Sequence, residues 1–327
     1  MLAGKTILIT GGAGSLGSNL VERLLSNDAI GKVIIYSRDE LKHHYMSWRF
    51  PVSKYPIDYM IGDVRDLEKL TLACKSADIV IHTAALKQIS TCEDNPEECY
   101  KTNVVGTQNI IKAVKANNVK KVLFISTDKA VEPTSVYGNS KQAGERLITN
   151  ADSEECIFAT VRLGNLLGSA GSVIPFFMEI KHTGEIPITH PEMTRFGGTM
   201  QEGADACLYA LENMRGGEIF IPRWKSFSVG DLAQAIAPEC RKKIIGSRKH
   251  EKMHEQFFAK VEISRLLENK DYYIIAKEKL TNDESLDLYR SIEAEIDERF
   301  ISYSQEKWTI EELSAFIDHS VQLNRKI

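Results

Sequence analysis

The sequence lacks the features of a membrane-spanning, secreted or nucleic-acid-binding protein. No apolar stretch approaches the ~18 residues that cross a bilayer, and no signal-peptide pattern precedes the first strand-like run at Thr6. The formal net charge of -4 and the pI of about 6.1 exclude the cationic surface that binding to a phosphate backbone requires. We therefore predict a cytoplasmic protein that contacts neither membranes nor nucleic acids.

Cysteine is sparse, and internal repeats and low-complexity segments are lacking. The 6 cysteines are scattered without a C-x-x-C pair, mostly in apolar or helical-looking surroundings, which predicts reduced, structural thiols. What is present is typical of a globular chain: 327 residues, of which 43% are hydrophobic and 26% charged. Such a chain can bury the core of one large domain or of two smaller ones.

The first half of the chain alternates short β-branched runs with amphipathic stretches, a pattern typical of a parallel sheet covered by helices. The strand candidates are 6–10, 32–37, 57–61, 79–82, 122–126 and 158–163, and the helix candidates are 16–25, 66–74, 96–116 and 136–148. After about Gly168 the alternation lapses and Pro and Gly become frequent. We predict an α/β protein with a Rossmann-type doubly wound parallel sheet in residues 1–168, to which later segments can return. Residues 169–327 would form a smaller α+β portion that binds the substrate.

A glycine-rich turn, TGGAGSLG at residues 10–17, follows the first predicted strand and precedes an apolar helix face. Glycines here let backbone N–H groups approach a pyrophosphate, whose charge the helix N-terminus favours. A tight strand-to-helix loop is the simpler alternative, but the position at the start of a β-α-β unit favours nucleotide binding. The cofactor residues predicted in this turn are Gly11, Gly14, Ser15, Leu16 and Gly17.

The end of the second predicted strand indicates which dinucleotide binds. NAD-binding proteins usually place Asp or Glu there for the ribose 2′-hydroxyl, whereas this chain has Ser37 and Arg38. Together with Lys42 they suit the 2′-phosphate of NADP. Asp39 and Glu40 keep NAD as the alternative. We predict NADP, and the remaining residues assigned to it are Asp39, Asp63, Val64, Thr83, Ala84, Lys87 and Asn103.

The fifth predicted strand ends in Thr127, Asp128 and Lys129, and a predicted helix carries Tyr137 and Lys141. Residues four apart share one helical face, so Lys141 can lower the phenol pKa of Tyr137 and reach the cofactor ribose. A Y-x-x-x-K pair alone occurs in many helices by chance. Its order and spacing after the glycine turn and strand five predict a redox fold acting at a carbinol, with Tyr137 as acid and base.

Segments spread over nearly the whole chain resemble the inverting UDP-N-acetylglucosamine 4,6-dehydratases of the pseudaminic acid pathway, which are extended short-chain dehydrogenases/reductases. These segments are 37–42 (SRDELK), 62–66 (GDVRD), 84–87 (AALK), 126–130 (STDKA), 171–177 (GSVIPFF), 193–196 (MTRF) and 217–222 (GEIFIP). The resemblance implies an NADP-dependent, homo-oligomeric enzyme acting on a UDP-sugar and producing a 4-keto-6-deoxy sugar inverted at C5.

The chemistry implied by the resemblance has three stages. Hydride leaves sugar C4 for NADP⁺ while Tyr137 takes the hydroxyl proton, then C5 is deprotonated as water leaves C6, and the hydride returns to C6. The resemblance assigns Lys129 as the C5 base, and Asp128 is the natural acid for the C6 hydroxyl. Simple epimerases place no acid and base at 127–129, so this triplet favours dehydration over UDP-sugar 4-epimerisation, the alternative. Tyr137 also favours the inverting branch, because retaining relatives typically have methionine there and carry membrane segments.

The resemblance also implies the substrate residues, which are Lys87, Lys129, Asn165, Val173, Thr189, Arg195, Arg248 and Glu251. Arginine suits a diphosphate because its planar fork pairs two phosphate oxygens. Three departures from the family lie near this expected pocket: GG for Trp-Ile at 197–198, KH for Pro-Gly at 249–250, and QIS for His-Val-Pro at 88–90. They bear on the sugar that is bound more than on the type of reaction.

Two other classes of protein were considered. Residues 250–254, HEKMH, satisfy the H-E-x-x-H pattern of zinc peptidases, in which two histidines of one helix bind the metal. The loop-like approach at 246–248 and the lack of a patterned third ligand favour a chance match, and we predict no metal site. A non-catalytic NADP sensor on the same fold is disfavoured because Tyr137, Lys141, Asp128 and Lys129 are all present.

Overall fold

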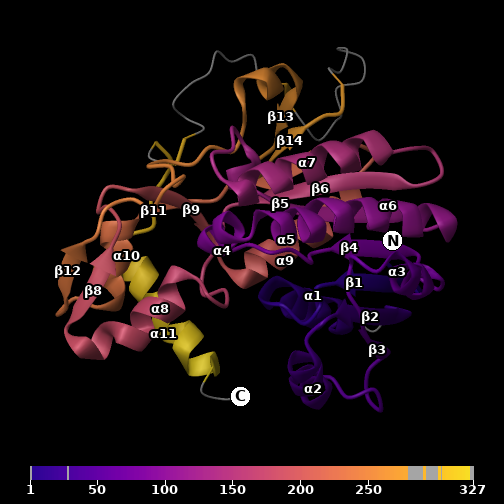
Figure 1. The fold of residues 1–327 in the computed structure, drawn as a ribbon, viewed down its shortest axis with the longest axis horizontal. Helices are drawn as coiled ribbons and strands as arrows, with labels where there is room; N and C mark the ends of the chain where they lie inside the picture. Colours follow the sequence, from indigo (N-terminus) through magenta and orange to yellow (C-terminus); the bar gives the residue numbers. More distant parts are fainter. Residues whose placement is uncertain (1, 28, 279–289, 292–300, 303, 325–327) are drawn as a thin grey trace.

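The computed structural model of the chain describes residues 2–27, 29–278, 290–291, 301–302 and 304–324. Within them, a 10-stranded sheet with the order β15-β13-β14-β10-β6-β5-β4-β1-β2-β3 forms the centre of the molecule (Figure 1). From β10 to β3 all neighbours are parallel, which confirms the predicted Rossmann-type α/β fold. These strands are β1 (Thr6–Thr10), β2 (Lys32–Ser37), β3 (Ile57–Ile61), β4 (Ile79–His82), β5 (Lys121–Thr127), β6 (Ile157–Leu163) and β10 (Ile219–Pro222).

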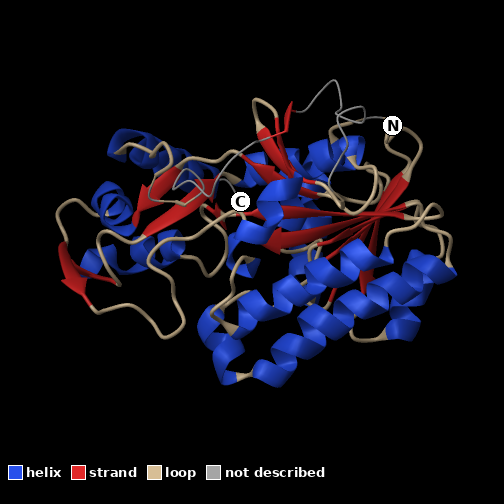
Figure 2. Cartoon of the chain, turned by 90° about the horizontal axis from the view of Figure 1, so that it is seen from above, coloured by secondary structure: helices blue, strands red, loops and turns tan. Residues whose placement is uncertain are grey.

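Helices cover both faces of this sheet, as Figure 2 shows. One face is covered by α1 (Ser15–Leu25), α2 (Glu40–Arg49) and α9 (Met200–Asn213), and the other by α3 (Leu67–Cys74), α6 (Gly106–Ala116) and α7 (Val136–Ala151). Because both faces are buried, the strands are nearly continuous apolar runs. In β1, for example, Ile7 and Ile9 belong to one buried cluster, whereas Leu8 belongs to the cluster on the opposite face.

The helix predicted over 96–116 forms, but in three parts. It begins as α5 (Pro96–Tyr100), widens into a π-helical turn at Lys101–Val105 and continues as α6; α4 (Ile89–Asp94) precedes it. The wide turn carries Asn103, whose amide Nδ2 donates to the Leu86 carbonyl at 2.9 Å and whose Oδ1 accepts from the Leu86 N–H at 2.8 Å. The π turn therefore anchors the loop that follows β4, as such turns often do near functional sites.

Part of the second half of the chain returns to the large sheet. Strand β10 pairs with β6, and β14 (Tyr272–Ile275), β13 (Leu266–Glu268) and β15 (Arg290–Ser291) extend the sheet antiparallel. The rest forms a smaller α+β region, on the left in Figure 1. It consists of β7 (Asn165–Leu166), β8 (Glu185–Ile188), β9 (Thr194–Gly198), β11 (Ser226–Ser228), β12 (Arg241–Ile244), α8 (Val173–Ile180), α10 (Val229–Ile236) and α11 (Ile310–Asn324). None of the described helices combines the length and apolar character needed to cross a bilayer.

Candidate active site

The glycine turn after β1 has the close backbone packing that a dinucleotide site requires. Gly11 has φ +69°, and a Cβ at Gly17 would lie 2.5 Å from the Gly11 carbonyl oxygen and 2.6 Å from the Gly12 Cα. Gly14 caps α1 without a side-chain hydrogen bond, and the first turn of α1 has no acidic residue. The N–H groups at this helix end are thus suited to a pyrophosphate, and the turn fits the predicted cofactor.

Two carboxylates lie near the end of β2, and they have different partners. Asp39 accepts a hydrogen bond from the Lys42 N–H at 3.0 Å, which lowers the pKa of Asp39. Arg38 is half-exposed, and its Nη1 lies 3.5 Å from Asp63 Oδ2. Arg65 binds the same Asp63 carboxylate, and Ser37 Oγ lies 2.5 Å from His43 Nε2. The Asp39 carboxylate is therefore engaged with α2, while the Arg38 guanidinium remains accessible beside the end of β2.

The loop after β4 reaches from the glycine turn toward the second half of the chain. Thr83 Oγ1 donates to the Thr10 carbonyl at 2.7 Å, and Thr83 and Ala84 pack directly against Gly11. Lys87 Nζ lies 3.2 Å from Ser169 Oγ, and burial lowers the pKa of Lys87. Asn103, in contrast, lies behind this loop with its polar groups used within the protein. Asn103 therefore holds the loop in place, and its side chain does not face the glycine turn.

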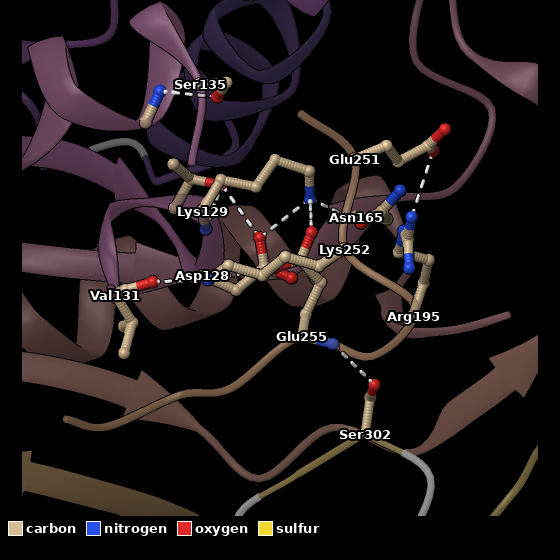
Figure 3. Close-up of polar contacts among 12 residues, drawn as sticks. Asp128, Lys129, Val131, Ser135, Asn165, Arg195, Glu251, Lys252, Glu255 and Ser302 are labelled. Atoms are coloured by element: carbon tan, nitrogen blue, oxygen red, sulfur yellow. Dashed lines mark hydrogen bonds and ion pairs between the residues drawn. The ribbon is translucent and has the colours of Figure 1, made fainter. Parts of the chain in front are cut away.

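Asp128 and Lys129 form a buried ion pair directly after β5 (Figure 3). The Asp128 side chain is fully buried, and its Oδ1 accepts from Lys129 Nζ and from Thr127 Oγ1, each at 2.9 Å. Asp128 Oδ2 has no hydrogen-bond partner within the described part of the chain. Lys129 Nζ also donates to Asn165 Oδ1 at 3.2 Å. One oxygen of a buried carboxylate is thus held by the lysine, and the other has its hydrogen-bonding capacity unused.

Tyr137 and Lys141 lie on the first turns of α7, whose N-cap Ser135 accepts from the Gly138 N–H at 3.1 Å. The prediction that Lys141 lowers the phenol pKa is wrong for this arrangement. Burial raises the pKa of Tyr137 well above its usual range; a hydrogen bond with Thr127 opposes that increase and the charge of Asp128 adds to it. The Lys141 ammonium instead lies 3.9 Å from the centre of the Phe124 ring.

The predicted substrate residues fall into two groups. The first lies around Lys129: Asn165 contacts it, and Arg195 Nη2 donates to Glu251 Oε1 at 3.0 Å in the same region. Arg195 is buried, and its Nη1 donates to the carbonyls of Thr194 and Met253. The second group does not contact Lys129 directly: Val173 begins α8, Thr189 Oγ1 contacts Met193 Sδ at 3.3 Å, and exposed Arg248 contacts Glu251 through its backbone N–H at 3.4 Å.

One charged residue of this region was missed from the sequence. Glu255 is 2% exposed, its Oε1 lies 3.6 Å from Lys129 Nζ, and its Oε2 has no hydrogen-bond partner among the described residues. Together with Lys129 and Lys252 it lines a small hollow, hereafter the Lys129 hollow, whose lining residues are Ile89, Lys129, Thr134, Ser135, His250, Glu251, Lys252 and Glu255. No local pattern marks Glu255, because the segment that carries it is irregular and far from Lys129 in the sequence.

The H-E-x-x-H residues do not form the zinc-peptidase arrangement. Residues 250–254 are not helical, and His250 has the left-handed φ of 64°. His250 Nε2 lies 3.8 Å from Glu93, whereas His254 Nδ1 lies 2.8 Å from Thr194 Oγ1, so the two imidazoles have different partners. Across the described residues, no group of three or more His, Cys, Asp or Glu side chains is placed to hold a metal ion.

The three departures from the family pattern have different surroundings. At 197–198 the backbone of β9 packs against Phe227 and Trp224, whose rings occupy the space that side chains there would need. At 88–90, Gln88 Nε2 donates to the Gly171 carbonyl at 3.0 Å and Ile89 lines the Lys129 hollow. At 249–250, His250 lines the same hollow. The substitutions at 88–90 and 249–250 therefore border the hollow, and the glycines pack into the core.

A parallel sheet with a glycine turn after β1, and with tyrosine and lysine four residues apart on the helix after β5, defines a short-chain dehydrogenase/reductase. Comparison with known proteins agrees. The family model described as polysaccharide biosynthesis protein matches residues 7–277. The chain belongs to this family.

Its relatives include nucleotide-sugar enzymes of two kinds. An inverting UDP-N-acetylglucosamine 4,6-dehydratase of Campylobacter jejuni is 44% identical over 292 residues, 87% of this chain and 87% of that protein. A UDP-glucose 4-epimerase of Rickettsia bellii is 38% identical over 287 residues, 84% of each chain. The X-ray structure of Pen from Bacillus thuringiensis matches with a TM-score of 0.90 at 34% identity, covering 98% of this chain and 99% of that one.

Proposed function

We propose that this protein is a C5-inverting UDP-N-acetylglucosamine 4,6-dehydratase that uses NADP. The observation that carries the proposal is the buried Asp128–Lys129 pair at 2.9 Å beside Tyr137. Oxidation at a carbinol needs only Tyr137 and a cofactor, whereas elimination of water needs a further base and a further acid. The pair supplies one of each. The 44% identity to the Campylobacter jejuni enzyme of that name supports the same reaction.

The assignment of NADP as the cofactor is supported by the glycine turn after β1 and by the residues at the end of β2. The N–H groups at the start of α1 would hold the pyrophosphate, and Arg38 with Ser37 would hold the 2′-phosphate. Asp39 does not compete for that position, because it caps α2 and pairs with Lys42 at 3.2 Å. NADP bound there supplies hydride transfer at the sugar carbons.

The substrate diphosphate would lie between Lys87 and the start of α8. Ser172 caps α8 without a side-chain hydrogen bond, and its buried Oγ has no partner within the described part of the chain. A helix N-terminus, an unpartnered hydroxyl and a lysine together suit a phosphate group. The sugar would then extend toward Lys129 and Tyr137.

The chain's own groups move three protons. Tyr137 Oη, once ionised to the phenolate, accepts the proton of the C4 hydroxyl. Lys129 Nζ accepts the C5 proton as a neutral amine, and Asp128 gives a proton to the departing C6 hydroxyl, which leaves as water. Burial would lower the pKa of Lys129, but Asp128 and Glu255 outweigh it and raise that pKa, so Lys129 rests as an ammonium. Transfer of one proton along the 2.9 Å contact to Asp128 converts both residues at once into the forms that elimination needs.

The test is incubation of the protein with UDP-N-acetylglucosamine and NADP, followed by mass spectrometry of the nucleotide sugar. We expect a product lighter than the substrate by one water. A product of unchanged mass but altered C4 configuration would instead show 4-epimerase activity, the activity named for the Rickettsia bellii relative.

A further inference from the structure

The Asp128–Lys129 pair works only while it holds one shared proton. With no proton, Asp128 has none to give to the C6 hydroxyl; with two, Lys129 has no free electron pair for the C5 proton. The rate of elimination should therefore depend on pH in a bell shape. It should fall at high pH, where the pair loses its proton, and at low pH, where the pair gains a second one. Any charge held close to the pair moves both limbs in the same direction, because it changes the affinity of the pair for protons.

Glu255 is the charge that the fold places there. Its Oε1 lies 3.6 Å from Lys129 Nζ, beyond hydrogen-bond length but within strong electrostatic range, and the side chain is almost fully buried. Its position is fixed by the backbone, because the Glu255 N–H donates to Ser302 Oγ and the Ser302 N–H donates to the Glu255 carbonyl, each at 2.9 Å. Ser302 Oγ in turn lies 2.7 Å from Thr194 Oγ1.

A purely structural role explains this carboxylate poorly. Its Oε2 is buried without a hydrogen-bond partner in the described residues, a costly arrangement for a carboxylate. The nearest other cation, Lys252, lies 3.9 Å from Oε2 and donates its hydrogen bond to the Val131 carbonyl at 2.6 Å instead. Glu255 thus faces Lys129 at 3.6 Å, with Lys252 as a second cation at 3.9 Å whose hydrogen bond goes elsewhere (Figure 3).

The other charged groups around Lys129 do not replace Glu255. Asp128 is a member of the pair. Arg195 opposes protonation of Lys129, and its own guanidinium is bound to Glu251 at 3.0 Å. Burial raises the pKa of Tyr137, which also faces Asp128, so its phenol carries no charge in the free protein. Glu255 is therefore the anion outside the pair that most directly favours its shared proton.

We propose that Glu255 is a positioning residue that sets the pH range in which Asp128 and Lys129 share one proton. The inference rests on the proposed dehydration. In the elimination itself the C5–H bond breaks, its proton bonds to Lys129 Nζ, and its electron pair forms the C5–C6 double bond. The C6–O bond breaks and the hydroxyl leaves as water with the Asp128 proton. Glu255 forms and breaks no bond in this step.

The experiment measures kcat for water elimination against pH for the unsubstituted enzyme and three variants, with NADP and UDP-N-acetylglucosamine saturating. Glu255→Gln removes the charge and keeps the shape, so both limbs should move to lower pH by about one unit or more. Glu255→Asp keeps the charge, so its limbs should stay in place even if its maximum falls. Glu306→Gln, at an exposed carboxylate that pairs with Lys225, is the control for a changed net charge and should leave the profile unmoved.

Overlapping profiles for the unsubstituted and Glu255→Gln enzymes would overturn the inference while leaving dehydration intact. A profile lowered in height without displacement would show a structural role and would also overturn it, as would an equal displacement in Glu255→Asp. If the unsubstituted enzyme eliminates no water, the proposed function fails first and the inference fails with it. Thermal melting of each variant identifies any that has not folded.

Discussion

Lys129 and Lys141, the two lysines of the candidate catalytic centre, have opposite electrostatic surroundings. For Lys141, burial lowers the pKa to about 7, and its Nζ lies over the Phe124 ring, 3.9 Å from the ring centre. For Lys129, burial acts in the same direction, but Asp128 and Glu255 reverse the result. At neutral pH Lys129 is therefore charged, whereas Lys141 is close to its titration midpoint. A base that rests as an ammonium needs a partner that takes its proton, and Asp128 is in hydrogen-bond contact.

Replacing Lys129 with alanine separates the two halves of the proposed reaction. Lys129→Ala should retain C4 oxidation, because Tyr137 is untouched, and should lose water elimination by at least a hundredfold, the usual size of a general-base contribution. Stopped-flow absorbance of the reduced cofactor and mass analysis of the sugar measure the two steps. Full turnover by this variant would show that another group removes the C5 proton.

Arg38 should decide between the two dinucleotides. Arg38→Ala would remove the charge-assisted hydrogen bond that we propose to the 2′-phosphate, a type of contact worth ~1.5–3 kcal/mol, so NADP should bind roughly ten- to a hundredfold more weakly. NAD has no such phosphate, and its affinity should be unchanged, which makes it the internal control. Calorimetric titration with both nucleotides checks this; equal losses for both would mean that Arg38 serves the fold and not the choice of cofactor.

At the scale of elements, the strand-to-helix junctions are the parts that sequence reasoning predicted best. The turn at residues 10–17 requires glycine for local reasons, and the helix predicted over 136–148 begins at Val136, where Ser135 caps it. The approach of Glu255 to Lys129 could not be predicted, because an irregular segment makes it across a long sequence separation. The orientation of Lys141 was also not predicted. Helical spacing places Lys141 on the same face as Tyr137, but it does not determine whether the ammonium contacts Tyr137 or the Phe124 ring.

The junction of β1 and α1 should not tolerate a methyl group at Gly17. In Gly17→Ala the new Cβ would meet backbone atoms of Gly11 and Gly12 at 2.5–2.6 Å, so α1 must move away from the turn. We expect at least tenfold weaker NADP binding and a loss of ~1–3 kcal/mol in the free energy of unfolding. Ser18→Ala, on the next residue of the same helix, is the matched control. Unchanged NADP affinity in Gly17→Ala would contradict the assignment of this turn to the pyrophosphate.

At the scale of the whole molecule, the two halves of the chain are joined by a buried charge cluster. Arg162, near the C-terminal end of β6, donates to Glu145 on α7 at 2.8 Å and to Glu262 at 2.9 Å. Its Nη1 also donates to the Phe257 carbonyl, two residues after Glu255. The cluster thus connects the helix carrying Tyr137 with the later segment that returns to the large sheet and carries Glu255.

Removing the cation should destabilise the molecule strongly. Arg162→Met leaves Glu145 and Glu262 buried without their partner, and breaking such a pair typically costs ~3–5 kcal/mol. Lys225→Met is the matched control, because Lys225 also pairs with two carboxylates, Glu306 and Glu312, but at the surface, where the loss of stability should be much smaller. Urea unfolding curves measure both. Similar losses in the two variants would contradict the role of the buried cluster.

The most direct test of the account is the configuration at C5 of the product formed from UDP-N-acetylglucosamine in D₂O, determined by NMR. The account predicts a 4-keto-6-deoxy sugar that carries deuterium at C5 and is inverted there. It predicts this because the proton removed by Lys129 is replaced from solvent on the opposite face. A product that retains its C5 hydrogen and configuration, or that still carries its C6 hydroxyl, would contradict it.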